Sequence, residues 1–148
     1  MQTARIRTGR QSGVTLIELM TVLAILAIVA TMAVASYRNY ILRANRTDGT
    51  STLLRLQVAQ EKFFLQNNRY ATNAEMTAAP PNGLGLALGA GGLTAGGRYT
   101  MTLVSPSNTQ YTATATAAGG QTADTACLAL SIDQAGTRTP GTASGCWR

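Results

Sequence analysis

The chain has 148 residues, with 12 Lys and Arg against 6 Asp and Glu and a formal net charge of +6, and it contains no His. Its length suits one domain together with a membrane helix. Without His, zinc sites of the usual His/Cys type and general acid–base catalysis by His are excluded, and no nucleophile motif accompanies the few acids, so the sequence predicts neither an enzyme nor a cofactor or metal site.

A short basic leader precedes a long apolar run. Residues 14–35 are apolar apart from Glu18 and scattered Thr, and 22 residues suffice to span a bilayer as a helix. A lone acid in such a segment is costly unless it finds a partner, so Glu18 is a candidate functional residue. The leader contains no acid and three arginines, which are expected to stay on the cytoplasmic side of the membrane: Arg5, Arg7 and Arg10.

Two other interpretations of the apolar run remain. Ala33-Val34-Ala35 is an A-x-A pattern followed by Ser36, at which a secretory signal peptidase would cut. Against this, the run is long for a signal peptide, it contains a charge, and helical sequence continues beyond it. A plain single-pass anchor would explain the length of the run, but it explains neither Glu18 nor the adjoining Gly13.

From residue 36 to about residue 68 the sequence predicts an amphipathic continuation of the same helix. We expect one long helix, with Gly49 as the weak point at which it would bend, because glycine costs about 1 kcal/mol relative to Ala in a helix. Apolar residues recur at helical spacing, and their stripe is expected to pack against a sheet. The stripe consists of Tyr37, Tyr40, Ile41, Ala44, Leu53, Leu56, Gln60, Phe63 and Phe64, and is widened by Leu54 and Val58.

A loop and a series of strands follow the helix. Asn67-Asn68 and Pro80-Pro81-Asn82-Gly83 stop the helix, and residues 71–97 are predicted as a flexible connection. Alternating patterns then predict three strands, with Leu128, Leu130 and Ile132 on one face of the third. The strands are predicted at residues 99–103, 111–117 and 127–132, and the turns at residues 105–108 and 133–136. Antiparallel hairpins on one face of a long helix give an α+β domain with a sheet of three to four strands.

The two cysteines, Cys127 and Cys146, lie near the C-terminus. An even pair in an exported chain predicts a disulfide, because an oxidising compartment favours the bond. The bridge would close a loop of about 20 residues and stabilise the fold by roughly 3 kcal/mol. Two free thiols would instead suit a cytosolic protein, and the N-terminus argues against that location.

The N-terminal motif closely resembles that of type IV prepilins, in which a Gly is followed by an aromatic or apolar residue and then by Thr-Leu-Ile-Glu-Leu. Here it reads Gly13-Val14-Thr15-Leu16-Ile17-Glu18-Leu19. The leader, the apolar and amphipathic half-helices, the loop, the strands and the late cysteine pair also come in the order of type IV pilins. The resemblance implies the pilin fold, with Cys127 and Cys146 bounding a C-terminal disulfide loop.

At the N-terminus, the resemblance implies that prepilin peptidase cuts between Gly13 and Val14 and that the new amine of Val14 is methylated. Glu18 would pair with the N-terminal amine of a neighbouring subunit during assembly. Two positions depart from the usual pattern, since Val14 replaces a Phe or Met and Ala35 replaces the Pro of many pilins. The implied divisions are a cleaved leader (1–13), a transmembrane and assembly half-helix (14–35) and a globular domain (36–148).

Several further stretches resemble minor pilins of the PilE type: residues 43–46, 53–54, 60–61, 66–70, 127–138 and 146–147. The resemblance therefore implies a structural subunit of a type IV pilus, and more narrowly a minor pilin that helps to initiate pilus assembly in twitching motility and adhesion. Its partners would be prepilin peptidase, other major and minor pilins, and the inner membrane. The globular domain would be periplasmic before assembly and on the cell surface afterwards. A pseudopilin of a type II secretion system is an alternative, although the disulfide-closed loop favours a true pilin.

A DNA-uptake receptor pilin is the second alternative. Removal of the leader leaves nine basic against six acidic side chains, a net charge of +3 that is too modest and scattered to predict nucleic-acid binding by itself. Such a receptor would require Arg98, Arg138 and Arg148 to cluster on one exposed face. The sequence therefore does not favour nucleic acid as a partner.

Overall fold

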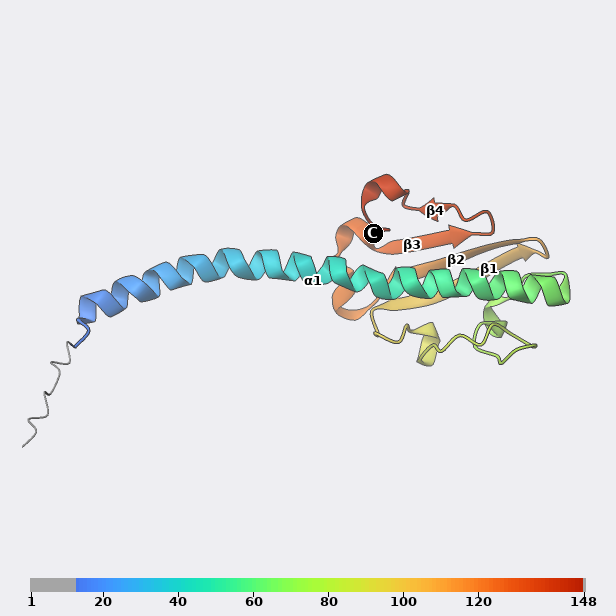
Figure 1. Cartoon of the computed structure of the whole chain (residues 1–148), viewed down its shortest axis with the longest axis horizontal. Coiled ribbons are helices and arrows are strands. Elements are labelled where there is room, and N and C mark those ends of the chain that lie inside the picture. The colour runs from blue at the N-terminus through green and yellow to red at the C-terminus, as the bar shows by residue number, and fades with distance from the viewer. Residues whose placement is uncertain (1–12, 148) are drawn as a thin grey trace, which may run out of the picture. The chain divides into compact units, whose positions relative to one another are not determined.

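The computed structural model describes residues 13–147, and the chain divides into two compact units, Met1–Tyr37 and Arg38–Arg148. The leader arginines Arg5, Arg7 and Arg10, and the C-terminal Arg148, lie outside the described residues. One helix, α1, spans Leu16–Asn67 and is followed by four strands (Figure 1). The strands are β1 (Tyr99–Ser107), β2 (Gln110–Ala117), β3 (Ala129–Asp133) and β4 (Arg138–Thr139). The prediction of one long helix followed by strands is thus confirmed.

In the first unit, α1 presents apolar side chains to its surroundings. The large apolar residues here are all exposed, from 47% for Val22 to 76% for Leu16. The hydroxyls of Thr21 and Thr31 donate to the carbonyls of Glu18 and Ile28, at 2.9 and 2.7 Å, so these polar groups are satisfied within the helix. Within residues 13–147, α1 is the one helix whose length and composition would allow it to cross a membrane.

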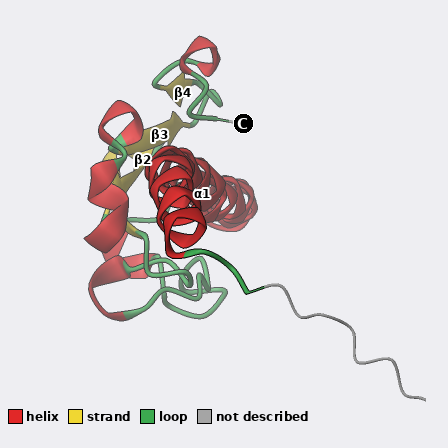
Figure 2. Ribbon diagram, turned by 90° about the vertical axis from the view of Figure 1, so that its left-hand side faces the viewer, coloured by secondary structure: helices red, strands yellow, loops and turns green. Residues whose placement is uncertain are grey.

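The second unit is built on an antiparallel sheet in the order β1-β2-β3-β4. One face of the sheet is buried against the C-terminal half of α1, which Figure 2 views nearly end-on. The strands alternate, so every second side chain enters the core. The sheet contributes Tyr99, Met101, Leu103, Tyr111, Ala113, Ala115, Leu130 and Ile132 to this core, and α1 contributes Leu53, Leu56, Gln60 and Phe63. The predicted α+β architecture is confirmed.

Two strand boundaries differ from the prediction. β1 continues to Ser107 through the residues predicted as a turn, with an irregularity of its pairing between Val104 and Ser107. Pro106 is tolerated there because β1 lies at the edge of the sheet, where a missing N–H costs no ladder bond. β3 begins only at Ala129, and Leu128, predicted to share a face with Leu130 and Ile132, is 43% exposed, whereas these two are buried. Leu128 has helical dihedral angles after a short 3₁₀ turn, so strand alternation does not apply to it.

The stripe that α1 buries is narrower than predicted. The exposed fraction is 69% for Tyr40 and 71% for Val58, against 0% for Leu53 and Leu56. Tyr37 is likewise exposed. Apolar residues therefore recur at helical spacing also at positions where neither the sheet nor the loop packs against them.

The loop after α1 is packed, and the prediction of a flexible connection for residues 71–97 is wrong. Gln60, which is fully buried, binds both backbone groups of Ala71: its amide donates to the carbonyl at 3.1 Å and accepts from the N–H at 2.8 Å. Met76, Leu84 and Thr94 are buried further along. Composition suggested flexibility, but these contacts give the loop a defined path.

An ion pair fixes the start of this loop. Arg69 and Glu75 form two hydrogen bonds of 2.6 and 2.9 Å. The Arg69 guanidinium, helped by the N–H of Thr72, lowers the pKa of Glu75 to about 2. The helix ends at Asn67, and Asn68 directly after it adopts a left-handed conformation with a φ of 53°.

Gly49 allows α1 to approach the sheet closely. A Cβ at this position would lie 3.1 Å from the ring of Tyr99, which is fully buried and receives a hydrogen bond from Gln121. We expect Gly49→Ala to lower the free energy of unfolding by about 1 kcal/mol, because overpacking of the fixed ring exceeds the gain in helix propensity. Urea unfolding would measure this, with the surface variant Gln66→Ala as control. A Gly49→Ala protein more stable than the native one would contradict it.

Candidate functional site

The predicted processing site lies just before α1. Gly13, Val14 and Thr15 are exposed and precede the helix, and nothing lies within 4 Å of where a Cβ on Gly13 would be. The Thr15 hydroxyl accepts a hydrogen bond from the N–H of Glu18 at 3.3 Å, which caps the first turn. The structure therefore leaves the Gly13–Val14 peptide bond open, one helical turn from Glu18.

Glu18 lies in the first turn of α1, where the helix dipole favours a negative charge. It is surrounded in sequence by exposed apolar side chains such as Ile17 and Leu19. The ion pairs within residues 13–147 join Arg46 to Asp124 and Arg69 to Glu75, so Glu18 has none there. Its carboxylate is therefore exposed and not ion-paired within the described part of the chain.

The C-terminal segment is closed by a disulfide between Cys127 and Cys146, as predicted. The two Cα atoms are 5.7 Å apart, and each residue is 1% exposed. The loop contains β3 and β4, and Trp147 follows it with the Arg138 guanidinium 5.3 Å from its ring centroid. The disulfide therefore fixes the C-terminal end of the chain to the sheet.

Removal of the disulfide should weaken the whole domain. Cys146→Ser is expected to lower the free energy of unfolding by about 3 kcal/mol, because the unfolded chain loses a closed loop. Reductant should destabilise the native protein by a similar amount and leave the variant unaffected, which provides the control. Two alkylatable thiols in native exported protein would contradict the bond.

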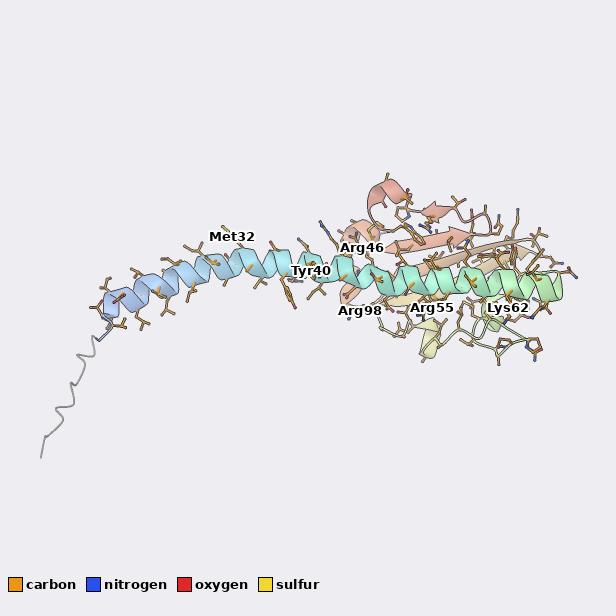
Figure 3. All side chains as sticks on the ribbon, in the orientation of Figure 1. Met32, Tyr40, Arg46, Arg55, Lys62 and Arg98 are labelled. Carbon is orange, nitrogen blue, oxygen red and sulfur yellow. A yellow bond between two sulfur atoms is a disulfide. The ribbon has the colours of Figure 1, made fainter. Side chains whose placement is uncertain are left out.

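Arg46 joins α1 to the base of the disulfide loop (Figure 3). Its Nε and Nη2 donate to the two carboxylate oxygens of Asp124 at 2.7 and 2.8 Å, and its Nη1 donates to the carbonyl of Gly145 at 3.2 Å. Asp124 is only 5% exposed, and its hydrogen bonds raise the pKa of Arg46. The sequence did not predict this pair, because no local pattern connects residues 78 positions apart.

Gln121 extends this network to Leu42 of α1 and Tyr99 of β1. Its side-chain nitrogen lies 3.0 Å from the carbonyl of Leu42 and 3.2 Å from both the Tyr99 hydroxyl and an Asp124 carboxylate oxygen, so its two N–H groups are shared among these three acceptors. Gln121 is 2% exposed, so these bonds form in a buried environment. The 3₁₀ segment Gly119–Ala123 is thereby tied to α1.

The arginines that a DNA receptor was predicted to gather do not all come together. Arg98 precedes β1 and Arg138 lies in β4, at opposite edges of the sheet. The pairing of neighbouring strands places Arg138 of β4 at the same height along the sheet as Leu103 of β1. Leu103 is five residues after Arg98 in the chain. Strand geometry therefore separates the two arginines by roughly 20 Å. Arg148, the third member, lies outside the described residues.

The acids of the second unit are engaged in internal hydrogen bonds, whereas most of its cations are not ion-paired. Asp124 and Glu75 hold arginines, and Asp133 accepts from two backbone N–H groups of its turn. Asp48 accepts from the Thr94 hydroxyl, and Glu61 from that of Tyr70. The cations outside ion pairs among the described residues are Arg38, Arg43, Arg55, Lys62, Arg98 and Arg138. The unit therefore carries its excess positive charge on its surface.

A groove of about 490 Å³ lies between α1 and the loop that follows it. Its lining is mainly apolar, and Arg55 and Lys62 border it from the same face of α1, two helical turns apart. The apolar lining consists of Leu54, Val58, Ala59, Phe63, Pro80 and Leu84. The sequence did not predict this groove, because one of its walls belongs to the loop that was predicted to be flexible. The described residues contain no cluster of His, Cys, Asp and Glu that could hold a metal.

Comparisons with known proteins identify the family. Residues 35–131 match the family described as "Type IV minor pilin ComP, DNA uptake sequence receptor". Residues 8–34 match the prokaryotic N-terminal methylation motif, which together with the apolar part of α1 supports anchoring in a membrane before assembly into a surface pilus. No curated protein matches the sequence.

A solved structure supports the fold independently. A type IV pilin from Shewanella oneidensis aligns with a TM-score of 0.51 and 19% sequence identity, over 72% of this chain and 98% of that one. At this identity the likeness concerns the fold alone, and the narrower resemblance to PilE-type minor pilins stays a prediction. Because the family match covers more than half of the chain, the protein belongs to the ComP family of type IV minor pilins and is a subunit of a type IV pilus.

Proposed function

We propose that this minor pilin is a DNA receptor of the pilus, with its globular domain as the DNA-binding part. The observation that carries the proposal is the family match over residues 35–131, whose description names a DNA uptake sequence receptor. The sequence alone did not favour nucleic acid, because its charges are few and scattered. The family match reverses that preference.

The charge distribution supports this proposal. Residues 38–148 contain nine basic and five acidic side chains, a net charge of +4. Asp124 and Glu75 are paired with arginines, and the other three acids accept hydrogen bonds from neutral groups, so the domain presents its net charge of +4 to an external polyanion. Cations that neutralise phosphates release counterions from DNA, which gives affinity without sequence readout.

Arg55 and Lys62 are the proposed phosphate contacts. They are exposed, they are not ion-paired within the described residues, and they lie on one face of α1 about 10 Å apart. Two adjacent cations of this kind can contact successive phosphates of one strand. Arg98 and Arg138 stand alone at opposite sheet edges and do not form such a pair.

Salt-dependent DNA retention tests the proposal. Full-length protein in nanodiscs is expected to retain duplex DNA, with a binding constant that falls as salt is added. A plot of the logarithm of the binding constant against the logarithm of the salt concentration should be shallower by about 2 in Arg55→Gln/Lys62→Gln, because each lost phosphate contact contributes about 0.9 to the slope. Arg98→Gln/Arg138→Gln removes the same charge and is the matched control. Absence of retention at low salt would reject the receptor function, and equal slopes for the two double variants would reject this pair as the contact.

The route to the pilus is proposed from the N-terminus. Prepilin peptidase would cut between Gly13 and Val14 in the inner membrane, the new amine would be methylated, and the globular domain would stand in the periplasm until assembly. The methylation-motif match over residues 8–34 and the exposed peptide bond support this route. Glu18 would then pair with the amine of a neighbouring pilin.

Gene deletion separates the receptor function from initiation of pilus assembly. Loss of DNA uptake with surface pili still present would support a receptor. Loss of surface pili, with the major pilin accumulating in the membrane, would instead assign this subunit to initiation, which the resemblance to PilE-type pilins implied.

A further inference from the structure

We propose that the globular unit has a phospholipid-binding surface, formed by residues 38–46 of α1 and by residues 119–127, which holds lipid headgroups of the bilayer before assembly. The headgroup surface, as we call it, is defined by Arg38, Arg43 and Thr125. Tyr40 lies at the same level of α1 but on the other side of the helix from Arg38. The headgroup surface is separate from the proposed DNA contacts at Arg55 and Lys62, so it does not rest on the DNA-receptor proposal.

Two adjacent hollows form this surface. One, of about 120 Å³, is lined by Arg38 together with Ile41, Leu42, Gly120 and Ala123. The other, of about 240 Å³, shares Leu42 and Ala123 with the first and adds Asn39, Arg43, Arg46, Asp124, Thr125 and Ala126. Each hollow thus combines an arginine with enough room for a phosphate group. The second also offers the Asn39 amide and the Thr125 hydroxyl as hydrogen-bond donors.

The electrostatic balance of the headgroup surface is positive. Its one acid, Asp124, is 5% exposed and is held by both N–H arms of Arg46 and by Gln121. Arg46 and Asp124 therefore offset one another. Arg38 and Arg43 are exposed and belong to no ion pair among residues 13–147, so their charges remain for a phosphate.

Tyr40 favours a membrane as the source of that phosphate. Its ring is 69% exposed on α1, and Figure 3 shows it projecting from the helix. It lies three residues before Arg43, so the two side chains are neighbours on the helix surface. Arg38, two residues before Tyr40, lies on the opposite side of the helix, so the tyrosine and the two arginines surround α1 at one level. Exposed tyrosines are typical of a membrane–water interface, where the ring sits at headgroup level.

The position of these residues in the sequence agrees with a bilayer. Arg38 and Arg43 follow the end of the 14–35 apolar run by three and eight residues, or about 5 and 12 Å of helix. The headgroup region extends roughly 5–8 Å beyond the hydrocarbon core on each side, and arginine side chains reach back toward it. By helix length, Arg38 and Arg43 are therefore within side-chain reach of lipid phosphates at the end of the apolar run.

Lipid retention by the full chain tests the headgroup surface. Protein reconstituted with equal phosphatidylglycerol and phosphatidylcholine would be purified in mild detergent, and the retained lipids would be quantified by mass spectrometry. Native protein is expected to retain phosphatidylglycerol in preference to phosphatidylcholine. Arg38→Gln/Arg43→Gln should reduce that preference by at least about fivefold, which is the effect expected from the loss of one cation near an anionic surface. Arg55→Gln/Lys62→Gln carries the same change of charge and should keep the native preference.

The remaining outcomes would overturn the proposal. An unchanged lipid preference in Arg38→Gln/Arg43→Gln, with native circular dichroism, would remove these arginines from lipid binding. Loss of duplex-DNA retention in that variant with lipid preference intact would assign them to DNA instead. In Tyr40→Trp/Trp147→Phe, headgroup-labelled nitroxide lipid should quench fluorescence more strongly than mid-chain-labelled lipid. Equal quenching would contradict the placement of Tyr40.

Discussion

Replacement of Glu18 by alanine is expected to reduce incorporation of this subunit into pili by roughly tenfold or more, while membrane insertion and processing continue. The side chain lies among exposed apolar residues of α1, and the described ion pairs do not include it. When these helices pack together and exclude water, the carboxylate needs a cation. The N-terminal ammonium of a neighbouring pilin, created by cleavage after Gly13, is the proposed one.

Quantitative mass spectrometry of sheared pili and of the membrane fraction would measure this effect. Glu18→Gln should lose incorporation like Glu18→Ala, because it keeps the shape of the side chain but not its charge. Thr21→Ala, whose hydroxyl bonds only to the backbone within α1, is the control and should be incorporated normally. Equal amounts of Glu18→Ala and native subunit in the pili would refute the assembly role.

Replacement of Arg46 by methionine is expected to lower the free energy of unfolding by about 3 kcal/mol, which would be among the largest effects of any single change in the domain. The substitution leaves Asp124 charged and buried, and removing one partner of a buried pair costs roughly 3–5 kcal/mol. Because Arg46 is 13% exposed, the lower end of this range applies. The bond from Arg46 to the Gly145 carbonyl would be lost as well.

A double-mutant cycle would isolate this ion pair. The stabilities of Arg46→Met, Asp124→Leu and the double variant would be measured by urea unfolding. The double variant should be more stable than either single variant, because each single variant leaves one buried charge unpaired and the double variant leaves none. If instead the double variant loses the sum of the single losses, the two side chains are not coupled. Arg55→Met, an exposed arginine of the same helix, should change stability little.

The parts of the fold that follow a local repeat were predictable. Alternation placed Tyr99, Met101 and Leu103 on the buried face, and helical spacing did the same for Leu53 and Leu56. The cysteine pair was predictable because export favours a disulfide. These signals depend only on neighbouring residues in the sequence.

What the sequence did not reveal depends on contacts between distant residues. Tyr40 continues the helical stripe, yet it is exposed because periodicity does not show where a partner surface ends. The pairing of Arg46 with Asp124 and the clamp of Gln60 on Ala71 have no local signature. The net charge of the domain follows from the sequence, but only the structure shows which groups each of its acids binds.

The central claim is that this chain is processed at Gly13 and assembled into a type IV pilus as a minor component. Intact-mass and N-terminal analysis of the chain recovered from sheared, purified pili tests it most directly. The expected result is a mature chain beginning at a methylated Val14, present in smaller amounts than the major pilin. A chain beginning at Ser36, or one absent from purified pili but present in the membrane, would contradict the account.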